Sequence, residues 1–158
     1  MAATTTQSIT LLIDKLIAAY PAFHFKRGAD FRWDPTQKTI FYNEASSDTA
    51  SLLHELAHAI LGHESFNKDI ELIEIERDAW THATKQLSPI YDIAIPNEIV
   101  EEALDTYRDW LHARSTCPNC SATGVQTKKG TYSCIVCSTH WRVNDARVCA
   151  LRRYTLTK

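Results

Sequence analysis

Residues 54–58 read His-Glu-Leu-Ala-His, and this pentapeptide carries the strongest chemical signal in the 158-residue chain. Side chains four residues apart lie one above the other on a helix, so both imidazoles can reach the same metal ion. Glu55 is offset by about 100° around a helix of about 3.6 residues per turn, so it borders that face without having to coordinate. The pattern is typical of a catalytic zinc site with His54 and His58 as ligands and Glu55 as the general base for a metal-activated water.

The sequence on either side of the pentapeptide predicts a capped helix over residues 49–61. Ser46, Ser47 and Asp48 are candidate N-caps, and Gly62 is a typical residue for the C-terminal stop. Upstream, apolar residues recur at helical spacing from residue 8 to residue 20. Three short aromatic and β-branched runs follow, and they predict a small antiparallel sheet over 23–25, 31–33 and 39–42. The fold class is therefore expected to be α+β.

A catalytic zinc ion needs a third protein ligand. The next helix, predicted over 68–87, offers four acidic candidates: Glu71, Glu74, Glu76 and Asp78. Glu76 lies on the apolar stripe of that helix, where a carboxylate is costly unless it is paired or metal-bound. Glu76 is thus the preferred ligand. Glu74 is the alternative, because an Asp four residues later could orient a ligating His. His63, just past Gly62, is a weaker candidate.

The run from His54 to His63 resembles the ImmA/IrrE-type metallopeptidase domain, a gluzincin-like family. The downstream family motif also matches in register, through Glu76, Ala79, Ala83, Leu87 and Pro89. The resemblance covers roughly residues 10–90. Two positions depart from the motif, since Trp80 stands where the family has Asn or Asp and His82 replaces the usual aromatic residue.

This resemblance implies a zinc-dependent peptidase fold. It implies that His54, His58 and Glu76 are the zinc ligands and that Glu55 is the general base.

Four cysteines form a second candidate metal site. Cys117 and Cys120 make one CxxC pair, and Cys134 and Cys137 make another after thirteen intervening residues. This spacing is typical of a zinc ribbon, in which four thiolates close a structural zinc site. Two disulfides are the alternative, but they require an oxidising compartment. Cys149 lies outside the pattern and is expected to be a small buried side chain.

The balance of charge changes at the same point of the chain as the cysteine content, since every cysteine lies after residue 111. Residues 1–111 hold 9 basic and 18 acidic residues, whereas residues 112–158 hold 8 basic residues and one acid. The predicted domains are a zincin-like domain over 1–92, a connecting helix over 93–114 and a zinc ribbon with a basic tail over 115–158. Aromatic residues interleave with the cations of this last segment. Such a surface can bind nucleic acid, or it can dock on the acidic helices.

No stretch has the roughly 18–20 uncharged apolar residues of a membrane helix, and no signal-peptide pattern opens the chain. We therefore expect a cytoplasmic protein that does not associate with membranes. Two Zn²⁺ ions are expected per chain, one catalytic and one structural. The leading hypothesis is a metallopeptidase that hydrolyses a peptide bond in a specific intracellular protein. The alternative is a non-catalytic zinc-ribbon module that binds nucleic acid or protein on a metal-stabilised zincin scaffold.

Overall fold

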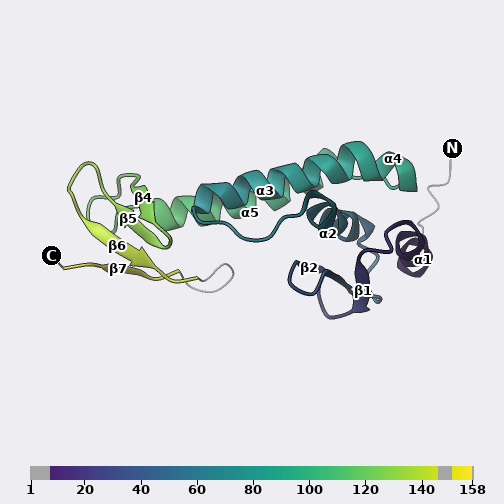
Figure 1. Ribbon diagram of the computed structural model, residues 1–158. Coiled ribbons are helices and arrows are strands. Elements are labelled where there is room, and N and C mark those ends of the chain that lie inside the picture. The colour runs from purple at the N-terminus through teal and green to yellow at the C-terminus, as the bar shows by residue number, and fades with distance from the viewer. Residues whose placement is uncertain (1–7, 146–150, 158) are drawn as a thin grey trace. The chain divides into compact units, whose positions relative to one another are not determined.

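The computed structural model describes residues 8–145 and 151–157 (Figure 1). Cys149, for which a buried position is predicted, lies outside the described residues. Internal contacts divide the chain into two compact units, the first comprising Met1–Glu64 and Arg77–Asn97 and the second Ser65–Glu76 and Glu98–Lys158. The division falls within one continuous helix, α3 (Asp69–His82), directly after Glu76. The predicted domains over 1–92, 93–114 and 115–158 stay a prediction.

The α+β class is confirmed by the elements of the first unit. They are α1 (Ile9–Ala19), β1 (His24–Arg27), β2 (Arg32–Asp34), β3 (Thr39–Tyr42), α2 (Thr49–Leu61), the second part of α3, a π-helical turn (Ala83–Leu87) and α4 (Ser88–Tyr91). The strand order is β1-β3-β2. β2 pairs with β3 antiparallel, as expected, but β1 pairs with β3 in parallel. β1 and β2 run in opposite directions and β3 lies between them, so β3 is parallel to one neighbour and antiparallel to the other.

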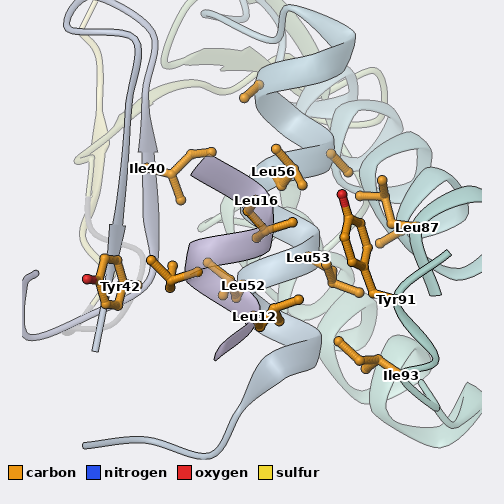
Figure 2. Packing of buried hydrophobic residues seen from close by; sticks show 14 of the residues in the cluster. Leu12, Leu16, Ile40, Tyr42, Leu52, Leu53, Leu56, Leu87, Tyr91 and Ile93 are labelled. Atoms are coloured by element: carbon orange, nitrogen blue, oxygen red, sulfur yellow. The ribbon is translucent and has the colours of Figure 1, made fainter. Parts of the chain in front are cut away.

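The core of the first unit fixes the position of α2. Figure 2 shows α1 and α2 between two groups of side chains, with β3 on one side and the segment from Leu87 to Ile93 on the other. Five leucines of α1 and α2 are completely buried: Leu12, Leu16, Leu52, Leu53 and Leu56. Each contributes about 1.5–3 kcal/mol by leaving water. This packing holds α2 by its apolar side.

Both ends of α2 are capped as the sequence predicts. The Ser51 backbone N–H donates to the Asp48 carboxylate at 2.9 Å. Gly62 ends the helix with a φ of 68°, a left-handed conformation that costs glycine little.

The helix predicted over 68–87 continues beyond residue 87. The π-helical turn directly before Ser88 widens the backbone where Pro89 has no N–H to donate, and the chain stays helical to Tyr91.

The second unit combines helices with a four-stranded sheet. It contains the first part of α3, α5 (Asn97–Ser115), β4 (Val125–Lys128), β5 (Thr131–Ser133), β6 (His140–Val143) and β7 (Arg153–Thr155). All three pairings in the order β4-β5-β6-β7 are antiparallel. β4 and β5 form a hairpin between the two cysteine pairs, and β6 and β7 extend its sheet.

A buried ion pair joins the elements of the second unit. The Arg114 guanidinium donates from Nε to Asp69 Oδ2 at 2.7 Å, and the Tyr132 hydroxyl donates to the same oxygen at 2.5 Å. Burial, and then the hydrogen bond to Asp69, raises the pKa of Tyr132, so this hydroxyl keeps its proton and donates it. The backbone N–H of Asp69 donates to Gln126 Oε1 at 2.7 Å. Asp69 therefore ties the start of α3 to α5 and the ribbon sheet.

We expect Asp69→Ala to lower the free energy of unfolding of the second unit by about 3–5 kcal/mol, because it leaves the Arg114 charge buried and unpaired. Urea denaturation of the full-length protein, followed by tryptophan fluorescence, measures the loss. The matched control is Asp105→Ala, which removes an exposed partner of Arg108 and should cost far less stability. Equal losses in the two variants would contradict this role of Asp69.

Candidate metal centres

The two histidines of α2 meet as their spacing predicts. His54 and His58 are 6% and 7% exposed, and their Nε2 atoms lie 3.0 Å apart. Nitrogens bound to one tetrahedral zinc ion at about 2.0–2.1 Å would lie about 3.3 Å apart. The observed separation is therefore close to that of two ligands of a single ion.

Glu76 of α3 completes a group of three. One potential ligand atom from each of His54, His58 and Glu76 lies within 4.8 Å of the others, so the group could hold a metal ion. Glu76 is 6% exposed, whereas Glu74 is exposed, as the apolar periodicity of the helix predicts. Two imidazoles and one carboxylate are a donor set that suits zinc. Their assignment as ligands stays a prediction that this arrangement supports.

Trp80 restrains the first histidine ring. Its indole stacks on the His54 imidazole, with ring centroids 4.2 Å apart and an interplanar angle of 21°. At this position the ImmA/IrrE-type motif has Asn or Asp, which could orient a ring by hydrogen bonding. In this chain a buried aromatic side chain restrains the ring by packing instead.

His63 contacts the second histidine ring, a contact that sequence reasoning missed. His63 Nδ1 lies 2.9 Å from His58 Nδ1, on the edge of the ring away from His54. If His58 Nε2 binds a metal, its Nδ1 carries the proton and donates it to His63. The sequence suggests His63 only as a weaker ligand candidate, yet its contact is that of a residue that orients His58. Its position just after Gly62 was the one available signal.

Glu55 is anchored to the sheet. The Trp33 backbone N–H donates to Glu55 Oε2 at 2.7 Å. The indole Nε1–H of Trp33 donates to the His63 carbonyl at 2.8 Å. Strand β2 thus holds both the half-buried carboxylate and the segment after α2. Sequence reasoning missed Trp33, because no spacing rule connects residues on a strand and a helix that are 22 positions apart.

The four cysteines form the second group that could hold a metal ion. Cys117 Sγ lies 3.6 Å from Cys137 Sγ, and Cys120 Sγ lies 3.5 Å from Cys134 Sγ. These distances are far from the roughly 2.05 Å of a disulfide and near the roughly 3.8 Å between sulfurs of a tetrahedral zinc site. A hydrogen bond with the Thr139 hydroxyl lowers the pKa of Cys137 to about 5. The cluster and its antiparallel sheet are consistent with a zinc ribbon.

The chain matches the IrrE N-terminal-like domain, a peptidase family, over residues 19–121, about two thirds of its length. The protein belongs to this family. The match includes both histidines, Glu55, Glu76 and the first CxxC pair, whereas the second pair and the strands around it lie beyond the match. No curated protein and no solved structure matches the chain. Over the described residues, no helix combines the length and the apolar character needed to cross a lipid bilayer.

We expect Glu76→Gln to reduce the zinc content of the purified protein from about two ions per chain to about one, because it removes the charged third donor. The matched control is Glu74→Gln, an identical change two residues away on the exposed side of α3, which should keep both ions. Elemental analysis after dialysis against a weak chelator measures the content. Loss of zinc from the Glu74 variant alone would make Glu74, and not Glu76, the third ligand.

Proposed function

We propose that this protein is a zinc-dependent metallopeptidase of the HExxH type that hydrolyses a peptide bond in a specific intracellular protein. The observation that carries the proposal is the convergence of three buried donors, two from α2 and one from α3, in a chain of a peptidase family. Three protein ligands leave the fourth tetrahedral position for water or substrate.

The donor set fits a catalytic zinc ion held by His54, His58 and Glu76. When bound, zinc supplies Lewis acidity, which polarises a peptide carbonyl and lowers the pKa of a water molecule to about 7. Trp80 and His63 each hold one imidazole in the orientation that this site requires. Their contribution is positional, since neither belongs to the three-residue group.

Glu55 is the proton carrier in this proposal. It accepts the proton of the attacking water and delivers it to the amine that leaves when the peptide C–N bond breaks. The hydrogen bond from the Trp33 N–H holds Oε2, so the proton transfers fall to the other oxygen, Oε1. Because this anchor comes from β2, we expect the orientation of the carboxylate to depend on the small sheet as well as on α2.

The four cysteines hold the second zinc ion, which is structural. Four thiolates fill all tetrahedral positions and leave none for a substrate. Metal binding contributes folding free energy to a segment whose own buried cluster is small. Cysteines that serve as thiolate ligands suit a reducing compartment, which supports the expected cytoplasmic location.

We expect Glu55→Gln to abolish peptide hydrolysis while both zinc ions remain bound. Removal of a general base costs typically about 10²–10⁴-fold in rate. The readout is the appearance of new N-termini, detected by mass spectrometry, in an extract of native intracellular proteins incubated with zinc-loaded enzyme. Glu74→Gln is the matched control, and it should cleave like the wild type.

Unchanged cleavage by the Glu55 variant would refute the role of Glu55. A wild-type protein that binds both zinc ions and produces no new N-termini would favour the metal-stabilised scaffold instead.

A further inference from the structure

One face of the ribbon sheet carries a row of polar and aromatic side chains, whose central residue Thr131 is buried while the others are exposed. In the strand registers, Lys128 pairs with Thr131, Thr131 with Arg142, and Arg142 with Tyr154. Cross-strand partners point to the same face of a sheet. The opposite face carries the next pair in register, Tyr132 and Trp141, which are buried and stacked. We call the row from Lys128 to Tyr154 the outer face.

The outer face borders an open hollow. The hollow has a volume of about 580 Å³, and its lining includes Lys129, Arg142 and Tyr154. Asn144 and Asp145 form part of the same lining. A volume of this size lies within the usual range for ligand sites, so a nucleotide unit can be accommodated.

Aromatic and cationic groups meet in this hollow. Tyr154 is 43% exposed, and the guanidinium carbon of Arg142 lies 5.6 Å from its ring centroid. An exposed tyrosine ring beside an arginine offers flat surfaces on which a nucleobase can stack. Lys129, at the turn between β4 and β5, adds a second cation that can reach a phosphate.

The charge of the surrounding ribbon favours a polyanion. Among the described residues from 116 onward, five cationic side chains are exposed and one carboxylate, that of Asp145, opposes them. The cations are Lys128, Lys129, Arg142, Arg152 and Arg153. Arg114 does not add to this surface, because it is buried and paired with Asp69. Positive charge alone would suit any polyanion, but an exposed ring among the cations favours one with unstacked bases.

We propose that the outer face of the ribbon binds single-stranded nucleic acid, with a base stacked on Tyr154 and phosphates at Arg142 and Lys129. The site lies on β-strands of the second unit and uses none of the residues assigned to peptide hydrolysis. The binding proposal can therefore be confirmed or refuted independently of the proposed peptidase activity.

Fluorescence anisotropy of the zinc-loaded full-length protein with labelled (dT)₂₀ tests this proposal. We expect binding at 50 mM salt that weakens steeply toward 200 mM, since single strands lose about 0.7 in log–log slope for each phosphate contact. Tyr154→Ala should weaken binding by about 5- to 150-fold, whereas Tyr154→Phe, which keeps the ring, should stay within about twofold of the wild type.

A second pair of variants isolates the contribution of charge. Arg142→Gln should weaken binding and reduce the salt slope by about 0.7. Lys85→Gln removes the same charge from an exposed position in the π-helical turn of the first unit, and it should leave binding unchanged. Each variant is first checked for wild-type zinc content and thermal stability, so that a loss of binding is not a loss of folding.

Several results would overturn the proposal. They are no detectable binding at 50 mM salt, tighter binding of the corresponding duplex than of the single strand, and an unchanged affinity in Tyr154→Ala. Competition by polyglutamate as effective as that by unlabelled poly(dT) would also overturn it, and would identify an acidic polypeptide as the partner.

Discussion

Two imidazole nitrogens held 3.0 Å apart in a buried site must have a proton or a cation between them. One turn of α2 places the two residues on the same side of the helix, and the packed leucines of α1 and α2 hold that helix in place. The buried carboxylate of Glu76 adds negative charge to the same place, which favours a divalent cation over a single shared proton. The contacts of Trp80 and His63 with the two rings are best understood as supports for this arrangement.

α3 carries the third donor, and the side chain of its first residue is buried and hydrogen-bonded. Asp69 is 1% exposed, and it accepts hydrogen bonds from Arg114 and Tyr132. Tyr132 in turn stacks on Trp141 in the cluster that also contains two of the cysteines. Seven residues after Asp69, the same helix presents Glu76. The ribbon sheet is thus connected, through consecutive packed contacts, to the helix that supplies the third donor.

Local patterns predicted much of this structure, and tertiary contacts account for the rest. Asp48, Gly62 and an apolar stripe define α2 within a few residues, so its bounds could be predicted. Glu76 could be preferred to Glu74 because burial follows helical periodicity. The parallel pairing of β1 with β3 could not be predicted, because strand order depends on packing between segments. The hydrogen bond from Trp33 to Glu55 was equally inaccessible, since a backbone donor leaves no trace in the residue type.

The most direct test is a crystal structure of the zinc-loaded protein with anomalous data collected on both sides of the zinc absorption edge. We predict one peak within about 2.0–2.2 Å of His54 Nε2, His58 Nε2 and a Glu76 oxygen, and a second at about 2.3 Å from the four cysteine sulfurs. A peak at the cysteines alone, with the two imidazoles sharing only a hydrogen bond, would contradict the claim that His54, His58 and Glu76 hold a zinc ion. Zinc bound by Glu74 in place of Glu76 would contradict the argument from burial on which the third ligand rests.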